Sequence, residues 1–200
     1  LSASICKTDL TSGLVGEFPE LQGIMGGYFS MHQGFDKDIS VAITEQYLPI
    51  GLDSKSPKKP FSVALSVTDK IDTIVGFFGI NEKPSSSKDP FALRRITLGI
   101  IRTIIENKKD LKMKDLLSYS SSLYQDQGHN FSNQDLQKEL YDFLKDRFRY
   151  YMKEKQIRFD IIDSIISSFS LNKLFSSFEK AYCLNKIIND QVGIDIISSY

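Results

Sequence analysis

Two aspartates three residues apart, Asp69 and Asp72, form the acidic pair whose spacing is best suited to chemistry. Residues i and i+3 share one face of a helix, so the two carboxylates could bind a metal ion, act as an acid–base pair or anchor arginines. The structural alternative is an ion pair with Arg94 or Lys70, because pairing is how folded proteins usually tolerate buried carboxylates. We favour the structural ion pair over a catalytic role.

The other residue types that carry catalysis are sparse. The two histidines, His32 and His129, stand far apart and have no neighbours at metal-ligand spacing. Cys6 and Cys183 are also far apart, which disfavours a disulfide scaffold or a thiolate zinc site and fits a reducing compartment. The sequence has no glycine-rich phosphate loop after a strand and no GxSxG motif. We therefore expect no catalytic residue and no metal site.

Two arginines seven residues apart, Arg95 and Arg102, belong to the stretch KDPFALRRITLGIIR at 88–102. At about 100° per residue they lie opposite the apolar stripe that begins at Leu93, so we expect both to be exposed. Arg94 falls on a flank that is itself apolar. We expect it to be buried and paired with Asp69 or Asp72, because an unpaired buried charge is very costly.

Charge is unevenly distributed, although the net charge is zero. Residues 1–54 have a balance of −5, residues 83–114 a balance of +6 and residues 145–158 a balance of +4. Local basic surface is the minimal feature of a protein that binds a phosphate-rich partner. Ordinary solvated helix faces give the same pattern, and charge alone favours that interpretation.

Length and composition indicate a globular chain of ordinary type. Its 200 residues suffice for one sizeable domain, or for one domain and part of another. No apolar run is long enough to span a membrane, and the N-terminus lacks the features of a signal peptide. We expect a cytoplasmic protein. Because the chain lacks an initiator Met and ends without a turn signal, we also expect a fragment of a longer protein.

Helical periodicity runs through nearly the whole sequence. We expect helices over residues 1–15, 18–32, 36–47, 61–79, 90–106, 113–125, 133–155, 159–168 and 171–189. Pro19, Asp89 with Pro90, and Ser132 suit the starts of three of these helices. No segment alternates as a strand would, so the predicted fold class is all-α, a compact helical bundle with short connections.

Four motifs in this order and spacing carry a family resemblance: VGEFPELQGIMG at 15–26, AITEQYLP at 42–49, TDKIDTIVGFFGI at 68–80 and KDPFALRRITLGIIR at 88–102. Together they closely resemble the beta subunit of the tetrameric, alpha/beta-type bacterial glycyl-tRNA synthetase. The second half of the chain matches more loosely. Gly27, where the family usually has a larger residue, and Asn81, where it commonly has Gly, depart from the pattern.

The resemblance implies a part in the ATP-dependent attachment of glycine to tRNA(Gly). In that family the alpha subunit carries the adenylate-forming site, where ATP and Mg²⁺ are used, so we expect no cofactor on this chain. Residues 1–125 would form an HD-like helical domain, and residues 126–200 a helical region leading towards an anticodon-binding domain. The expected partners are the alpha subunit and tRNA(Gly), with no membrane and no DNA.

HD domains are related to metal-dependent phosphohydrolases, which hold their metal with histidines and aspartates. By resemblance, KTDL at 7–10 stands where the His-Asp pair would be, and Asp9 and Asp69 are the remnants of the site. The histidines are missing, because His32 and His129 lie in the wrong places. The resemblance therefore implies a degenerate HD domain, and we predict neither hydrolase activity nor a tightly bound transition metal.

Three hypotheses follow. The first is an accessory segment that positions tRNA and contacts the alpha subunit, with basic side chains facing phosphate. The second is a metal-dependent phosphohydrolase, which the missing histidines disfavour. The third is a structural scaffold without direct tRNA contact. The candidates for phosphate contact under the first hypothesis are Lys88, Arg95, Arg102, Lys108 and Lys109.

Overall fold

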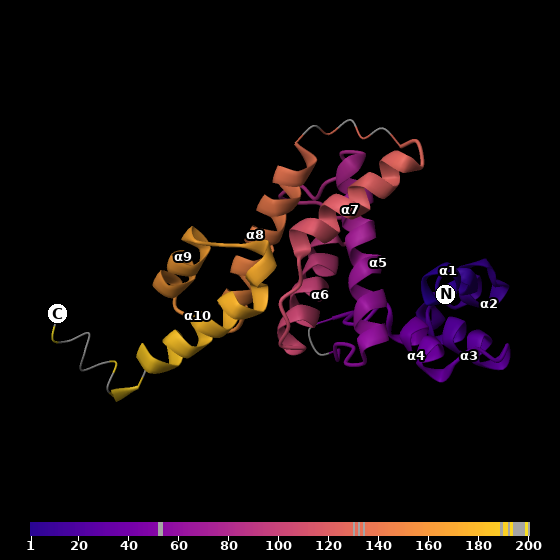
Figure 1. Cartoon of the computed structure of the whole chain (residues 1–200), viewed down its shortest axis with the longest axis horizontal. Coiled ribbons are helices and arrows are strands. Elements are labelled where there is room, and N and C mark those ends of the chain that lie inside the picture. Colours follow the sequence, from indigo (N-terminus) through magenta and orange to yellow (C-terminus); the bar gives the residue numbers. More distant parts are fainter. Residues whose placement is uncertain are drawn as a thin grey trace.

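The structure, a computed structural model, describes residues 1–51, 54–129, 131, 133, 135–188, 190, 191, 193 and 199, and within them all regular structure is helical (Figure 1). The all-α fold class is confirmed. In chain order the elements are α1 (Ser2–Ile5), η1 (Thr8–Thr11), α2 (Gly13–Glu17), η2 (Pro19–Leu21), α3 (Ile24–His32), α4 (Lys37–Glu45), α5 (Pro60–Gly79), α6 (Leu93–Glu106), α7 (Met113–Asp126), α8 (Leu136–Glu154), α9 (Phe159–Ser167), η3 (Leu171–Lys173) and α10 (Leu174–Ile188), where η marks a 3₁₀ helix. None of the described helices is long and apolar enough to cross a membrane.

Helix α5 is the centre of the arrangement. It packs against α4 on one side and against α6, α7 and α8 on the other, so that it joins the short N-terminal helices to the larger group (Figure 1). Helices α9 and α10 pack on each other, and they contact α8 and α6 respectively on the side away from α1–α4. The groove described below is bordered by α6 and α8 and by the segment that links α4 to α5.

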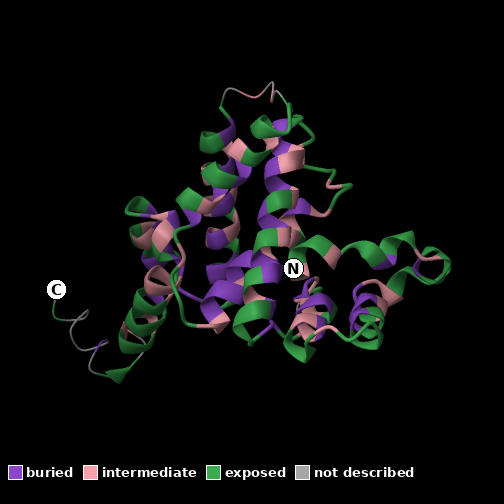
Figure 2. Cartoon of the chain, turned by 45° about the vertical axis from the view of Figure 1, so that its right-hand side comes forward, coloured by how far each residue is buried: buried purple, intermediate pink, exposed green. Residues whose placement is uncertain are grey.

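One large apolar core is built from residues of the elements α5 to α10. A second, small core lies among the N-terminal helices and the start of α5. In Figure 2 the buried residues, in purple, run along the central helices. Fully buried members of the large core include Ile74, Ile100, Ile101, Ile104, Leu140, Leu144 and Phe148. The small core consists of Cys6, Ala42, Ile43 and Leu65. The predicted domain boundary after residue 125 stays a prediction. Residues from before and after this position contribute to the same large core.

The first predicted helix, over residues 1–15, is wrong as a single element, because it divides into α1, η1 and α2. Hydroxyl groups bond to nearby backbone and compete with the helix. Thr11 Oγ1 donates to the carbonyl of Thr8 at 2.7 Å, and Ser12 Oγ donates to that of Asp9 at 2.7 Å. Ser12 has extended backbone and accepts from the amide of Val15, so a new helix begins there.

Helix α6 begins at Leu93, three residues later than predicted. The Asp89 carboxylate still caps it, accepting from the amides of Leu93 at 2.9 Å and Arg94 at 3.1 Å. Ala92, the residue just before the helix, has a left-handed conformation with φ 54°, which interrupts the helical backbone. Pro90 therefore lies outside the helix. The predicted helix over residues 18–32 also divides, because Pro19 starts only the short η2 and α3 begins at Ile24, after Gly23 with φ 80°. The remaining helix bounds differ from prediction by a few residues at most, except that η3 precedes α10, and Ser132 lies outside the described residues.

Two positions that depart from the family pattern have clear structural roles. A Cβ on Gly27 would lie 1.9 Å from Thr44 Oγ1 and 3.0 Å from the Ser40 carbonyl, so α3 approaches α4 closely because this residue has no side chain. Asn81 follows α5 with φ 62°, a left-handed conformation that glycine adopts freely and asparagine tolerates.

Candidate nucleic-acid interface

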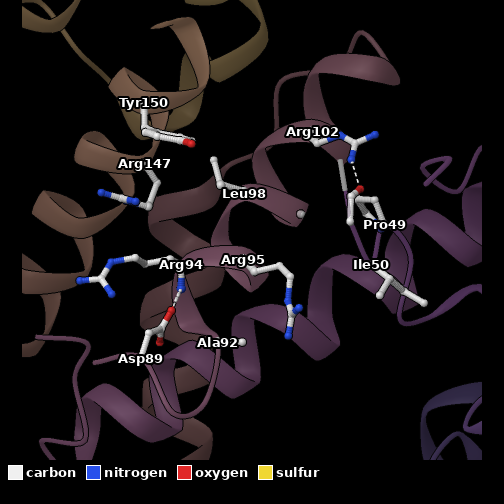
Figure 3. A pocket seen from close by; sticks show the side chains of 12 residues that line it. Pro49, Ile50, Asp89, Ala92, Arg94, Arg95, Leu98, Arg102, Arg147 and Tyr150 are labelled. Atoms are coloured by element: carbon white, nitrogen blue, oxygen red, sulfur yellow. Dashed lines mark hydrogen bonds between the residues drawn. The ribbon is translucent and has the colours of Figure 1, made fainter. Parts of the chain in front are cut away.

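A groove of about 580 Å³ lies between α6, α8 and the loop after α4. Its lining contains four arginines and one carboxylate. The lining residues are Pro49, Ile50, Gly51, Asp89, Ala92, Arg94, Arg95, Leu98, Gly99, Arg102, Arg147 and Tyr150. Figure 3 shows Arg147 and Tyr150 of α8 facing Arg94 and Arg95 of α6 across the hollow. Residues that are far apart in the sequence thus create one cationic surface.

Arg95 is the lining residue most available to a ligand. It is exposed, as predicted, and its side chain makes no hydrogen bond or ion pair within the described part of the chain. Arg94 is half-buried and donates to the carbonyl of Ser85. None of the ion pairs among the described residues involves either arginine. Both guanidinium groups therefore lack a carboxylate that an incoming anion would have to displace.

The predicted burial and pairing of Arg94 are wrong. Asp69 pairs instead with Lys7, whose Nζ lies 2.6 Å from Asp69 Oδ1. Asp72 is exposed, and its backbone carbonyl accepts from Tyr124 Oη at 3.2 Å. Arg94 lines the groove instead of packing among apolar side chains, so its guanidinium is partly exposed to solvent. Asp69 does form an ion pair, but its partner is neither Arg94 nor Lys70, the two partners that we predicted.

The prediction that Arg102 is exposed together with Arg95 is also wrong. Its side chain is 14% exposed and donates to the carbonyls of Gly51 at 2.6 Å and Ser54 at 2.8 Å. It also pairs with Glu106 one turn further along α6, at 3.1 Å. The loop after α4 covers this turn of the helix, and the helical period cannot anticipate that. Arg102 positions the wall of the groove rather than offering a free cation.

The three lysine candidates Lys88, Lys108 and Lys109 are exposed but do not line the groove. Lys88 precedes the α6 cap, and the other two follow the end of α6. Their contact with phosphate stays a prediction.

The two candidate remnants of an HD site have structural partners. Asp9 is buried, and its Oδ2 accepts from the amides of Gly23 at 2.6 Å and Gly26 at 3.2 Å, which start α3. Asp69 is engaged by Lys7. Across the described residues, no group of three or more His, Cys, Asp or Glu side chains could hold a metal ion. Both histidines are exposed, as expected.

Sequence reasoning missed the contribution of α8. Arg147 lines the groove, pairs with the neighbouring Asp146 and places its guanidinium 5.4 Å from the centre of the Tyr150 ring. The available signal was the charge balance of residues 145–158, which did not single out a residue. The helical period shows which face of α8 holds Arg147 and Tyr150, but it does not show that this face lies against α6. That information comes only from the packing of the two helices.

Lys70 was also missed as a buried cation. It is 5% exposed, and its Nζ donates to the carbonyls of Gln46 and Leu48, both at 2.9 Å, and to Ser66 Oγ at 2.8 Å. Burial lowers the pKa of this ammonium to about 8, although the charge of Asp69 opposes the shift. Lys70 therefore holds the start of the loop that Arg102 holds further on. Its stem lies against Gly99, where an added Cβ would be 3.1 Å from Lys70 Cε.

The fold and the groove define a helical protein with an arginine-lined groove and, among the described residues, no group of His, Cys, Asp or Glu side chains that could hold a metal ion. A family model described as "Glycyl-tRNA synthetase beta subunit" matches residues 1–167. The chain belongs to this family.

Curated relatives agree with that assignment. The chain is similar to the glycine–tRNA ligase beta subunit of Rickettsia canadensis, with 40% identity over the whole chain and 29% of the relative. The corresponding subunit of Rhodospirillum centenum is 36% identical over the whole chain and 28% of the relative. That of Acidithiobacillus ferrooxidans is 39% identical over 83% of the chain and 24% of the relative. The chain thus spans less than a third of the length of these relatives.

Proposed function

We propose that the chain is part of the beta subunit of a glycyl-tRNA synthetase and supports tRNA binding and subunit assembly rather than chemistry. The whole enzyme would attach glycine to tRNA(Gly) with ATP and Mg²⁺ at the alpha subunit, and the chain itself would bind no cofactor. Family membership supports this role. The observation that carries it is the groove in which Arg94 and Arg95 lack carboxylate partners.

Arginines in this state suit the RNA backbone. A guanidinium is always charged and donates hydrogen bonds in a planar fork that matches two phosphate oxygens. Such contacts supply affinity and orientation but carry little sequence information. In the proposed role, Arg95 contacts phosphate directly. Arg102 and Lys70 fix the loop that forms the facing wall, through the carbonyls of Gly51 and Leu48.

Subunit assembly has support on another part of the surface. Large apolar side chains are exposed on η1, α2 and α3 and on the short segments that join them. They are Leu10, Leu14, Phe18, Ile24, Tyr28, Phe29 and Met31. Scattered exposed apolar residues are normal, but a concentration of them on three short elements favours a protein contact. The proposed protein partner is the alpha subunit.

The test uses the complex of the alpha subunit with the full-length beta subunit. Arg95→Ala is expected to weaken tRNA(Gly) binding at low salt and to reduce the salt slope of the binding constant by about one. Lys138→Ala is the control, because Lys138 is an exposed cation of α8 that does not line the groove. If Arg95→Ala leaves tRNA(Gly) binding unchanged, Arg95 does not contact a phosphate of the tRNA.

A structural scaffold without tRNA contact remains the competing function. Capture of the beta subunit by immobilised alpha subunit, with and without tRNA, separates the two. If the exposed apolar residues of η1, α2 and α3 serve assembly, Phe18→Ser combined with Tyr28→Ser reduces capture both with and without tRNA. If tRNA improves capture, and Arg95→Ala abolishes that improvement, the scaffold function alone is insufficient.

A further inference from the structure

The arginine-lined groove continues into two neighbouring hollows. On the α8 side, a hollow of about 170 Å³ shares Leu98, Arg102 and Tyr150 with the groove and adds Lys155. On the other side, a hollow of about 480 Å³ shares the loop residues Pro49 and Ile50, and Arg95, with it. The three hollows therefore form one path across α6. Each is lined by at least one cationic side chain, and the two outer hollows also contain one carboxylate each, Glu154 and Glu20.

Tyr150 stands where the groove meets the hollow beside Lys155. Its ring is a wall of both, and the residue is 41% exposed. The Arg147 guanidinium lies 5.4 Å from the ring centre, which holds a cation next to the aromatic surface. In Figure 3 the ring extends over Leu98 into the open part of the groove. An exposed aromatic ring at this place is not needed for the apolar core, of which Tyr150 is not a member.

Cations and an aromatic platform along one path have a specific use in RNA recognition. Proteins that hold single strands combine a positive groove along the backbone with aromatic rings on which bases stack. A duplex keeps its bases stacked inside and offers phosphates and sugars to a protein, so a duplex would make no use of the ring. Phosphate contact alone would explain Arg95 but not Tyr150.

We infer that the groove binds an unpaired segment of RNA, with a base stacked on Tyr150 and an adjoining phosphate on Arg95. The inference rests on the proposed function and narrows it, since it names an unpaired strand as the part of the RNA that is bound. Arg147 lies beside the ring and is paired with Asp146, whereas Arg95 lines the groove without a carboxylate partner.

The test measures two probes on the complex of alpha subunit and full-length beta subunit. One probe is a short fluorescent oligouridylate, and the other is a blunt RNA duplex of similar charge. Tyr150→Leu is expected to weaken oligouridylate binding roughly 5- to 100-fold, the range for loss of one base–aromatic stack, and to leave duplex binding unchanged. Tyr150→Phe keeps the ring and is expected to bind both probes as the unaltered complex does.

The remaining outcomes separate this inference from the proposed function. If Arg95→Ala weakens binding and Tyr150→Leu changes neither probe, the groove is a phosphate site and the stacking inference is overturned. Equal weakening of both probes by Tyr150→Leu, or weakening by Tyr150→Phe to the same extent, also overturns it. If Arg95→Ala leaves tRNA(Gly) and both probes unaffected, the proposed function fails as well.

Discussion

Lys7 Nζ lies 2.6 Å from Asp69 Oδ1, so an ammonium of the chain itself neutralises the carboxylate that the family resemblance places at a hydrolase metal site. The Lys7 ammonium also contacts Tyr47, because Nζ lies 4.5 Å from the centre of the Tyr47 ring. The second remnant carboxylate, that of Asp9, accepts from two backbone amides at the start of α3. Both groups therefore stabilise the fold where a hydrolase would use them to hold metal.

The chain is expected to show no nucleotide phosphohydrolase activity with added Mn²⁺ or Fe²⁺. A divalent ion would have to displace Lys7 from Asp69 and would find no histidine among its neighbours. Release of inorganic phosphate from nucleotides, with each metal added, is the measurement. Metal-dependent turnover that Asp69→Ala abolishes would contradict this prediction, whereas turnover that survives Asp69→Ala would indicate a contaminant.

Arg102→Lys is expected to destabilise the chain by about 1–3 kcal/mol, because lysine cannot reach both loop carbonyls and Glu106 with one ammonium. The carbonyls of Gly51 and Ser54 would lose their shared donor, and amide hydrogen exchange would quicken around these two residues. Urea denaturation and hydrogen exchange provide the two readouts. Arg95→Lys, on the same helix but free of partners, is the matched control and is expected to change stability by less than about 0.5 kcal/mol. Equal losses in the two variants would show that Arg102 does not anchor the loop.

These two arginines show what the sequence can and cannot predict. Helical period fixes the helices and correctly places Arg95 on an exposed face, because both depend on residues close in sequence. The environment of Arg102 depends on the loop carbonyls of Gly51 and Ser54, and that of Arg94 on the carbonyl of Ser85. Partner choice for Asp69 and the contribution of Arg147 and Tyr150 also depend on tertiary packing. The candidate site was therefore only partly predictable, whereas the fold class was predictable throughout.

Gly27→Ala is expected to destabilise the chain by about 1–3 kcal/mol, the usual cost of overpacking a close contact. Its new Cβ would overlap Thr44 Oγ1 and press on the backbone carbonyl of Ser40, and the backbone cannot yield as a side chain can. Gly16→Ala is the control, because a Cβ there meets nothing within 4 Å and alanine favours a helix. Thermal and urea denaturation of the two variants should give opposite signs. A neutral result for Gly27→Ala would mean that Thr44 rotates and α4 moves away without loss.

Stability should rise with pH just above 8 because of Lys70. Burial lowers the pKa of this ammonium to about 8, from the ordinary lysine value of 10.5. Between these values the unfolded chain binds more protons at this residue than the folded chain, so the free energy of unfolding increases with pH. From pH 8 to 9 the gain is expected to be about 1 kcal/mol.

The Lys70→Met variant isolates this effect, since it lacks the titrating group but keeps an unbranched side chain against Gly99. Burial raises the pKa of the Cys6 thiol above 9.0 and those of Tyr124 and Tyr151 to about 12. In each case the unfolded state loses its proton first, so these groups lower stability as pH rises through their unfolded values. Because both proteins contain them, the difference in unfolding free energy between the original chain and Lys70→Met depends on Lys70 alone. Urea denaturation at pH 7.5, 8.0, 8.5 and 9.0 should show this difference moving in favour of the original chain. A constant difference would mean that the four acceptors around Nζ hold the pKa of Lys70 near its ordinary value.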